Sequence, residues 1–386
     1  MVVVGGGLGG ARTAEELRRE GYSGAITLVG AETHLPYDRP PLTKAMLRGE
    51  LDDTSLKPRE FYEEREITLR LGAGAQQVDT AAQTVTLTDA SVLGYDQLVI
   101  ATGLVPRRVP GLPDLDGIRV VRSVEDSRAL RQHASTARHA VVVGAGFIGC
   151  EVAASLRHLG LDVTLVEPQA TPLAAVLGEQ VGALVARLHR ANGVDVRAGV
   201  GVAEVRGTDA VTCVVLTDGD EVPADLVVLG IGSRPAMAWL DGSGIEVGNG
   251  ILCDASGRTS APNVWAVGDV AFWQGRPGHQ TRVEHWSNVA AQVRVMVPAM
   301  LGRDSLADVV VPPYFWSDQY DVKIQCLGEP EATDTVHLVT DDGHQFLAYY
   351  ERAGVLVGAV GAGMPGKVMG LRAKIAAGAP IAEVLD

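Results

Sequence analysis

The chain of 386 residues is long enough for two to three domains at about 150 residues each, and its 46% hydrophobic residues can give each domain its own core. With 33 basic and 47 acidic residues, the net charge of −14 disfavours binding to nucleic acid phosphates and to anionic lipid surfaces. Glycine is unusually frequent at 46 residues, whereas charged residues make up an ordinary 21%. We therefore expect the glycines to serve backbone geometry rather than disorder.

The first predicted element is a strand of three valines, Val2 to Val4, that runs into a G-x-G-x-x-G turn. A helix is predicted over 11–20 and a strand over 25–29, and an acid follows shortly after that strand. In dinucleotide-binding units such glycines permit the tight turn, the approach of backbone N–H groups to a pyrophosphate and close helix packing, while the acid binds a ribose. The predicted cofactor-binding residues of this unit are Gly5, Gly7, Leu8, Gly9, Gly10 and Glu32.

The same arrangement recurs further along the chain, where Val141 to Val143 lead into a second G-x-G-x-x-G turn. A helical pattern follows, then a strand over 163–166, and an acid comes directly after this strand. The predicted binding residues are Gly144, Gly146, Phe147, Ile148, Gly149 and Glu167. Because a dehydrogenase needs only one such site, two sites indicate a flavin adenine dinucleotide that stays bound and a nicotinamide dinucleotide that exchanges.

The remaining segments complete an α/β architecture. Short strands are predicted over 77–103 and 196–232, and a third passage over 259–269 ends in a strand and a glycine. After residues 312–313 the pattern changes to aromatic, alternating strands, followed by one helix over 365–377. The predicted fold class is therefore α/β, with two Rossmann-like dinucleotide-binding domains and a C-terminal α+β domain with an antiparallel sheet.

The four cysteines at 150, 213, 253 and 326 match the spacing of neither a zinc site nor a disulfide framework, and no metal site is predicted. A flavin-linked disulfide reductase needs a redox cysteine pair or a single cysteine near position 44, but no cysteine precedes Cys150. Cys150 is interpreted as a small packed residue. Electrons are therefore expected to leave for an external acceptor, and the chain, which has no apolar run of about 18 residues, is expected to be cytoplasmic.

With these units in this order, the chain resembles the two-dinucleotide-binding flavoprotein superfamily. Residues 35–44 (LPYDRPPLTK) and 315–319 (FWSDQ) are similar to those of the NADH-dependent ferredoxin reductases of bacterial oxygenase systems. The resemblance implies a glutathione-reductase-like fold. It implies an FAD-binding domain over 1–107 and 230–309, an NAD-binding domain over 108–229, and a C-terminal interface domain over 310–386.

The resemblance also implies further site residues. Lys44 would lie near the flavin ring, and Glu151 near the nicotinamide, where it would pair with Lys44; these two are the candidate catalytic residues. Gly230, Ile231 and Gly232 would contact NADH. The other residues implied to bind FAD are Arg39, Val78, Ala101, Thr102, Gly103, Arg122, Gly268, Asp269, Glu284, His285, Trp286 and Trp316.

The activity implied is hydride transfer from NADH to FAD and single-electron transfer to a [2Fe–2S] ferredoxin that feeds a haem monooxygenase or a ring-hydroxylating dioxygenase, with the reductase a monomer or weak dimer. NADH is expected over NADPH because Glu167 would meet a 2′-phosphate as a like charge, at a cost of up to roughly 4 kcal/mol. Two alternatives stay open: an NADH oxidase or quinone or dye reductase of the same fold, and a redox-gated interaction protein resembling apoptosis-inducing factors. An acidic ferredoxin would need a local basic face, for which the candidates are Arg65, Arg294, Arg303, Lys323, Lys367, Arg372 and Lys374.

Overall fold

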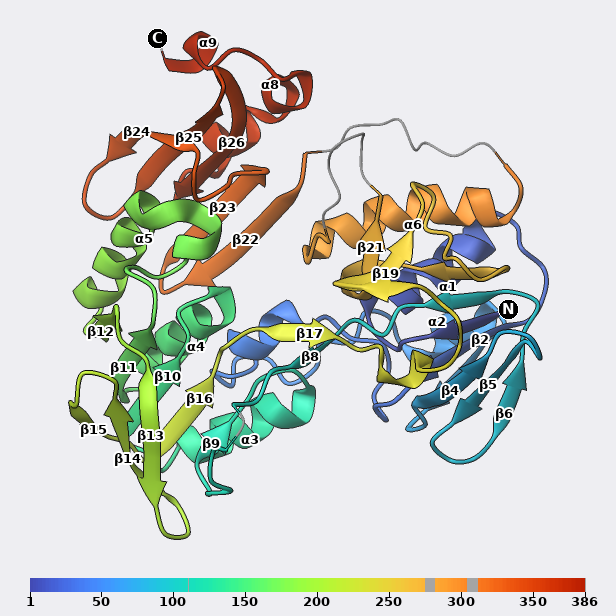
Figure 1. Ribbon diagram of the computed structural model, residues 1–386, viewed down its shortest axis with the longest axis horizontal. Helices are drawn as coiled ribbons and strands as arrows, with labels where there is room; N and C mark the ends of the chain where they lie inside the picture. The colour runs from blue at the N-terminus through green and yellow to red at the C-terminus, as the bar shows by residue number, and fades with distance from the viewer. Residues whose placement is uncertain (110, 275–281, 304–311, 386) are drawn as a thin grey trace. The chain divides into compact units, whose positions relative to one another are not determined.

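The computed structural model describes residues 1–109, 111–274, 282–303 and 312–385 (Figure 1). By backbone contacts the chain divides into two units. Unit 1 comprises 1–38, 54–105 and 234–313, and unit 2 comprises 39–53, 106–233 and 314–386. The short segment 39–53 thus belongs to unit 2, although both of its neighbours in the sequence belong to unit 1. The predicted division of the chain by cofactor stays a prediction.

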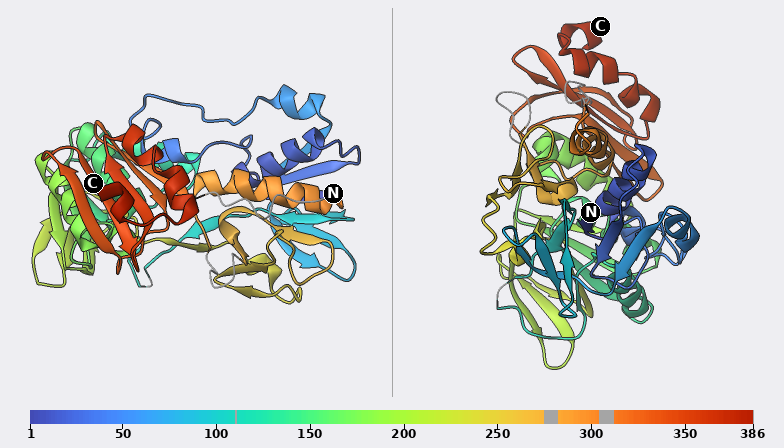
Figure 2. Two further views of the ribbon diagram at one scale, coloured as in Figure 1. Left: turned by 90° about the horizontal axis from the view of Figure 1, so that it is seen from above. Right: turned by 90° about the vertical axis from the view of Figure 1, so that its right-hand side faces the viewer.

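Unit 1 is built on a parallel sheet in the order β20-β7-β1-β2-β3. Val3 and Val99 point into a core shared with α1 and α6, whereas Val4 and Ile100 point into a core on the opposite face. Because both faces are covered, these strands are continuous apolar runs. Helices α1 and α6 lie side by side (Figures 1 and 2). The bounds are β1 Val2–Val4, α1 Leu8–Arg19, β2 Ile26–Gly30, β3 Ile67–Leu71, β7 Leu98–Ile100, β20 Val264–Ala266 and α6 Trp286–Met300.

Two small sheets and short helices complete unit 1. One sheet is the antiparallel meander β4-β5-β6, and the other has the order β18-β19-β21. Their buried residues, among them Val85 and Ile251, join Val4 and Ile100 in one core. The bounds are α2 Arg59–Glu64, β4 Ala75–Asp79, β5 Thr84–Leu87, β6 Val92–Gly94, η2 Ala238–Leu240, β18 Val247–Gly248, β19 Gly250–Cys253, η3 Gly268–Val270 and β21 Ala271–Trp273.

Unit 2 contains the second parallel sheet, in the order β12-β11-β10-β16-β9, and an antiparallel sheet, β13-β14-β15. The segment 39–53 is held in this unit by two buried hydroxyls: Ser127 donates to the Leu42 carbonyl at 2.7 Å, and Ser155 to the Thr43 carbonyl at 2.6 Å. The bounds are η1 Pro40–Thr43, β9 Ile118–Arg119, α3 Val124–Ala134, β10 His139–Val143, α4 Phe147–His158, β11 Asp162–Glu167, α5 Ala174–Ala191, β12 Asp195–Ala198, β13 Val202–Gly207, β14 Val211–Leu216, β15 Glu221–Pro223 and β16 Leu226–Leu229. Two short strands, β8 Leu104–Pro106 and β17 Ser233–Pro235, pair with each other in a two-stranded sheet.

The C-terminal part of unit 2 is a five-stranded antiparallel sheet in the order β22-β23-β26-β25-β24. Ala348 and Tyr350 pack into the core formed with α4 and α5, and Leu347 and Tyr349 pack on the opposite face. This alternation is that of a strand buried on both sides. The bounds are β22 Tyr314–Gln319, β23 Val322–Gly328, β24 Thr335–Asp341, β25 Phe346–Arg352, β26 Val355–Ala362, α7 Pro365–Met369, α8 Arg372–Ala377 and α9 Ala382–Leu385.

The predicted fold class is confirmed, with one local correction. The single helix expected over 365–377 is wrong, because the chain forms two short helices, α7 and α8, on either side of Gly370 and Leu371. Glycines at 366 and 370 weaken a continuous helix, because glycine loses more conformational freedom on folding than other residues. In the described part of the chain no helix is long and apolar enough to cross a membrane.

Candidate functional site

The first glycine turn links β1 to α1, and each of its three glycines has a different environment. Gly5 has a φ of +131°, and a Cβ there would lie 2.1 Å from the Ala101 carbonyl oxygen. A Cβ at Gly10 would lie 2.0 Å from the Gly5 oxygen, so this glycine is required by helix packing. A Cβ at Gly7 would meet no described atom within 4 Å. The protein's own packing therefore does not require Gly7, whereas a group that approaches the backbone there would.

The second glycine turn, between β10 and α4, repeats this pattern. Gly144 has a φ of +94°, and a Cβ there would lie 2.5 Å from the Gly230 oxygen. A Cβ at Gly149 would lie 1.9 Å from the Gly144 oxygen, while one at Gly146 would again be in open space. Helices α1 and α4 both begin without a side-chain cap and without an acid in the first turn. Both helix N-termini therefore suit a phosphate.

The two predicted acids lie next to the turns but are held differently. Glu167 is the last residue of β11, and its carboxylate accepts hydrogen bonds from the backbone N–H groups of Ala145 at 2.6 Å and Gln169 at 3.0 Å. Glu32 lies two residues beyond β2 and accepts a hydrogen bond from the buried hydroxyl of Tyr37 at 2.6 Å. Both carboxylates are thus positioned by their own unit, as a ribose contact requires.

Several of the other residues expected to bind FAD gather in unit 1, at the carboxyl ends of parallel strands. Thr102 follows β7 and donates its hydroxyl hydrogen to the Ala236 carbonyl at 2.9 Å. Gly268 follows β20, and its N–H donates to the buried Gln292 side chain at 2.8 Å. In a parallel sheet these carboxyl ends share the edge at which ligands bind. Together with the open turn at Gly7, the residues of this edge, Ala101, Thr102, Gly103, Gly268 and Asp269, fit a dinucleotide such as FAD.

The remaining unit 1 candidates lie on separate elements. Val78 is buried in β4, so its side chain is part of the core and only its backbone could meet a ligand. Trp286 is the first residue of α6, and its indole N–H donates to an Asp38 carboxylate oxygen at 2.6 Å. Next to it, burial lowers the pKa of His285 to about 4, and Glu284 forms an ion pair with Arg282.

The predicted pairing of Lys44 with Glu151 is present in unit 2. The Lys44 Nζ atom lies 2.7 Å from Glu151 Oε2, and only 8% of Lys44 and 4% of Glu151 are exposed. Two further donors meet the same carboxylate: the Thr43 hydroxyl at 2.6 Å from Oε2 and the Ser317 hydroxyl at 2.8 Å from Oε1. Burial raises the pKa of Glu151, and Lys44, Thr43 and Ser317 oppose that rise.

The match between α4 and β22 explains how Ser317 reaches Glu151. Phe147 and Glu151 are four residues apart on one face of α4, about 6 Å along the helix axis. Phe315 and Ser317 are two residues apart on the inward face of β22, about 6.6 Å along the strand. The rings of Phe147 and Phe315 meet edge to face at 4.6 Å, and one step along each element Glu151 meets Ser317.

Other expected residues of unit 2 take separate positions. Arg39 donates a hydrogen bond to the Arg122 carbonyl, so these two candidates are brought together. Trp316 points to the outward face of β22 and stacks on Tyr314, with ring centroids 6.0 Å apart. The set Gly230, Ile231 and Gly232 follows β16, and Gly230 packs against the second glycine turn.

Three contacts of the site residues are not evident from the sequence. Thr43 and Ser317 bind Glu151, and Tyr37 binds Glu32. All three lie inside or beside the two segments, 35–44 and 315–319, that carry the family resemblance. The resemblance therefore marked the segments that contain these residues. It did not identify the contact of Ser317 with Glu151, because the two are 166 residues apart and neither spacing nor composition links them.

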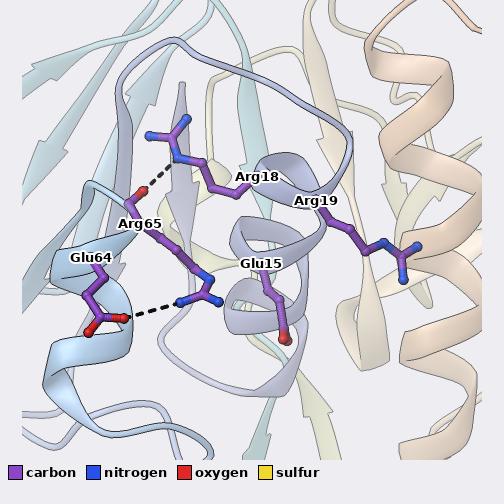
Figure 3. A pocket seen from close by; sticks show the side chains of 5 residues that line it. All are labelled: Glu15, Arg18, Arg19, Glu64 and Arg65. Atoms are coloured by element: carbon purple, nitrogen blue, oxygen red, sulfur yellow. Dashed lines mark hydrogen bonds and ion pairs between the residues drawn. The ribbon is translucent and has the colours of Figure 1, made fainter.

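A pocket of about 570 Å³ lies elsewhere in unit 1 and is lined by charged residues of α1 and α2 and by Arg65 (Figure 3). Its cations are engaged by the protein itself. Arg18 donates to the carbonyl oxygens of Arg65, Tyr22 and Gly24, and Arg65 lies 3.9 Å from both Glu64 and the centre of the Phe61 ring. None of the residues that line this pocket belongs to a glycine turn. Because Arg65 already contacts Glu64 and Phe61, it is a weaker candidate for docking an acidic ferredoxin. Two other docking candidates are also paired within the protein, Arg303 with Glu20 and Lys323 with Asp318.

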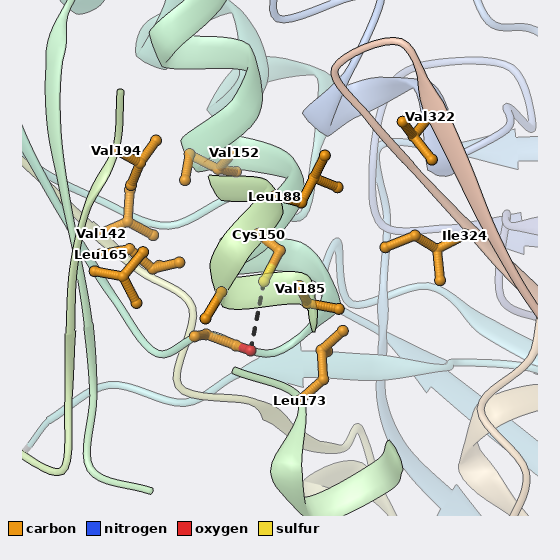
Figure 4. Packing of buried hydrophobic residues seen from close by; sticks show 14 of the residues in the cluster. Val142, Cys150, Val152, Leu165, Leu173, Val185, Leu188, Val194, Val322 and Ile324 are labelled. Carbon is orange, nitrogen blue, oxygen red and sulfur yellow. Dashed lines mark hydrogen bonds between the residues drawn. The ribbon is translucent and has the colours of Figure 1, made fainter. Parts of the chain in front are cut away.

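The thiol of Cys150, which directly precedes Glu151, is sealed in the core of unit 2. Cys150 is fully buried among Val142, Val185 and Leu188, and its Sγ atom contacts the Ala145 carbonyl oxygen at 3.5 Å (Figure 4). Burial raises the pKa of this thiol, so it stays protonated and unreactive. The interpretation of Cys150 as a packed residue is confirmed, and Cys253 and Cys326 are buried as well.

Comparison with known proteins agrees with this architecture. Residues 1–292 match the family described as pyridine nucleotide-disulphide oxidoreductase, and residues 314–385 match the reductase C-terminal family. A ferredoxin–NAD(P)(+) reductase from a Sphingomonas species is 38% identical, with 92% of this chain and 88% of that protein covered. Rhodocoxin reductase from Rhodococcus erythropolis is also 38% identical, covering 88% of this chain and 80% of the relative.

Among solved structures, the covalent complex of putidaredoxin reductase with putidaredoxin contains a chain that matches with a TM-score of 0.95. Its sequence identity is 32%, and the match covers 100% of this chain and 94% of that chain. The fold of this chain, including its C-terminal sheet, therefore occurs in a known architecture. The chain belongs to the pyridine nucleotide-disulphide oxidoreductase family, in the branch that contains the ferredoxin reductases of oxygenase systems.

Proposed function

We propose that this protein is an NADH-dependent flavoprotein reductase that holds FAD and passes electrons to a [2Fe–2S] ferredoxin serving an oxygenase. The proposal rests on one combination of features. Both glycine turns have an open middle glycine, and the cysteine that follows the second turn, Cys150, is fully buried. Two dinucleotides can bind, but the buried Cys150 cannot act as an internal thiol acceptor. Electrons that enter from one dinucleotide therefore leave for an acceptor outside the chain.

FAD is held by the first glycine turn, with Glu32 at its ribose and the edge formed by Thr102, Gly268 and Asp269 along its length. When bound, it supplies the chemistry that accepts a hydride and releases electrons singly. The further contacts implied by the resemblance, from Arg39, Val78, Arg122, the 284–286 segment and Trp316, belong to this proposal. So does the placement of Lys44 beside the flavin ring and of Glu151 beside the nicotinamide.

NADH is held by the second turn, and Glu167 selects it. The Glu167 carboxylate stands at the end of β11, where it would accept hydrogen bonds from the adenosine 2′-hydroxyl. A 2′-phosphate would instead meet a like charge. The hydrogen bonds from the backbone N–H groups of Ala145 and Gln169 support this role, because they hold the carboxylate beside the second turn.

A ferredoxin is proposed as the acceptor because the relatives that match over most of the chain are named for that activity. Several of them are components of dioxygenase systems, and another is named rhodocoxin reductase. The oxygenase served is accordingly a ring-hydroxylating dioxygenase or a haem monooxygenase. We place the protein in the cytoplasm, where NADH is available.

The test is the steady-state rate of NADH oxidation by the FAD-loaded protein with a purified [2Fe–2S] ferredoxin, with ferredoxin reduction and oxygen uptake recorded together. Fast ferredoxin reduction with little oxygen uptake is the expected result. Rapid oxygen uptake that added ferredoxin does not divert would identify an oxidase instead. Reduction of the bound flavin without turnover to either acceptor would favour a redox-gated interaction protein.

Gly149→Ala is the matched control for this assay. The added methyl group would lie 1.9 Å from the Gly144 oxygen, so the second turn is disrupted while the first turn is untouched. The variant should keep its FAD and lose ferredoxin reduction driven by NADH. Chemical reduction of the bound flavin should still support electron transfer to ferredoxin in this variant.

A further inference from the structure

The hydrogen bonds that hold Glu151 continue away from Lys44 into the C-terminal sheet. Ser317 donates to Glu151, and the amide nitrogen of Gln319 donates to the Ser317 hydroxyl oxygen at 3.1 Å. Ser317 and Gln319 are both fully buried, because the alternation of β22 turns them inward. A buried polar chain therefore leads from the ion pair into the core of unit 2.

The direction of these hydrogen bonds follows from the donor inventory. An amide nitrogen only donates, so the Ser317 oxygen must accept from Gln319. A hydroxyl has a single hydrogen, and with its oxygen accepting from Gln319, that hydrogen is directed to Glu151 Oε1. The other carboxylate oxygen is met by the Thr43 hydroxyl and the Lys44 ammonium. The arrangement suits an ionised Glu151 that accepts from all sides.

His189 on α5 is a further buried polar residue of this core. It is fully buried, and burial lowers its pKa to about 4, so the ring is neutral at pH 7 and has one donor and one acceptor nitrogen. Nδ1 lies 2.8 Å from the hydroxyl of Tyr320, whose pKa is raised by burial. With Tyr320 as the donor, Nε2 carries the ring hydrogen.

Gln319 lies beside this ring, since its side chain contributes to the electrostatics of His189. Gln319 Oε1 and His189 Nε2 are both buried, and neither has a hydrogen-bond partner among the described residues. The Gln319 amide nitrogen does have a partner, the Ser317 hydroxyl. The hydrogen-bonded chain therefore runs from Gln319 through Ser317 to Glu151.

We propose that Ser317 and Gln319 form a positioning relay that keeps the Glu151 carboxylate ionised and directed at Lys44. The functional role of the relay rests on the proposed function of Lys44 and Glu151, whereas its geometry does not. Glu151 faces Lys44 and Thr43 from the 39–53 segment, Ser317 from β22, and the neutral Cys150 thiol on its own helix. Among these groups, Ser317 is the one that the C-terminal sheet contributes.

The test is the titration of Glu151 in the FAD-loaded protein without NADH, followed by the ¹³Cδ chemical shift of labelled glutamate. Glu151→Gln identifies the signal. In Ser317→Ala a donor to the ionised form is lost, so the pKa of Glu151 should rise by about one unit or more. Ser317→Thr keeps the hydroxyl and should restore the original titration. Gln319→Leu frees the Ser317 hydroxyl to turn and should give a smaller rise.

Tyr350→Phe is the matched control, because it removes another fully buried hydroxyl of unit 2, one that donates to the Leu177 carbonyl and touches neither Glu151 nor residues 39–53. Its Glu151 titration should match that of the wild type. An unchanged titration in Ser317→Ala, or an equal change in Tyr350→Phe, would overturn the relay. Thermal unfolding shows whether Ser317→Ala is still folded. If it is not, the Glu151 titration in Gln319→Leu decides the test.

A second readout tests whether the relay serves the reaction. In stopped-flow reduction of the bound flavin by NADH, the acidic limb of the pH profile should move upward in Ser317→Ala and not in Tyr350→Phe. If Ser317→Ala shifts the Glu151 titration in the NMR experiment but leaves the pH profile of flavin reduction unchanged, the relay positions Glu151 but has no role in hydride transfer. Failure of ferredoxin reduction in the wild type would refute the proposed acceptor and leave the NMR result standing.

Discussion

The two glycine turns share a backbone design, but their acids are held in different ways. In both, the first glycine has a positive φ, the last is required by packing, and the middle one faces open space. Glu167 is bound by two backbone N–H groups, one of them from its own turn, whereas Glu32 is bound by a tyrosine side chain. The turn geometry thus provides a dinucleotide site, and the surroundings of the acid distinguish the two sites.

The largest effect should come from the packing glycines. Gly10→Ala and Gly149→Ala each place a methyl group within about 2 Å of a carbonyl oxygen, which should destabilise the local turn by about 3 kcal/mol, the upper end for overpacking. Gly10→Ala should purify without flavin, and Gly149→Ala should retain it. Visible absorbance of the purified proteins measures this. Equal flavin content in the two variants would show that the turns do not serve different dinucleotides.

Glu167→Arg should change the preference of the second turn for NADH over NADPH, and so should distinguish this turn from the first. Removing a like charge worth up to about 4 kcal/mol and adding an opposite one should lower the ratio of kcat/KM for NADH over NADPH by at least roughly 100-fold. Asp162→Arg makes the same charge change at the other, exposed end of β11 and serves as the control. A ratio that does not move in Glu167→Arg would contradict the assignment of the second turn.

Gly146→Ala separates binding from stability. Because a Cβ there meets open space, the melting temperature of the protein without NADH should be unchanged. A methyl group between backbone and pyrophosphate should weaken NADH binding by roughly 10- to 100-fold, as measured by titration of the oxidised flavoprotein with NAD analogues. Gly94→Ala, also in open space but on β6 and outside both turns, is the control. Unweakened binding would mean that the ligand does not approach Gly146.

The smallest effect should come from Tyr37→Phe, which removes the hydroxyl that holds Glu32. A net loss of about 1 kcal/mol should weaken FAD binding to the apoprotein roughly 5-fold, with the KM for NADH unchanged. Flavin fluorescence quenching measures the affinity. Tyr62→Phe loses a buried hydroxyl for which the described residues provide no partner, and it should bind FAD as the wild type does. A matching loss in both variants would indicate a general effect of tyrosine removal.

The parts of the fold and site that were predictable from sequence are those encoded locally. The glycine turns and the acids follow from spacing within a single strand-helix-strand unit, and the strand pattern after residue 313 predicted an antiparallel sheet. The pairing of Lys44 with Glu151 came from the family resemblance, because the two residues are far apart in the sequence. The contact of Ser317 with Glu151 depends on how a strand of the C-terminal sheet lies along α4, which no local pattern records. The break at Gly370 was missed because two short helices and one long helix have similar apolar spacing.

The placement of residues 39–53 in unit 2 has a consequence for protein engineering. This loop is encoded between two stretches of unit 1, yet it supplies Thr43 and Lys44 to the carboxylate of Glu151. A chimera that exchanges only residues 106–233 with a homologue would combine a foreign glutamate with native loop donors. Exchanges that respect the architecture must carry three separate pieces of the gene, 39–53, 106–233 and 314–386, so recombination at a single crossover point would break up this set of residues.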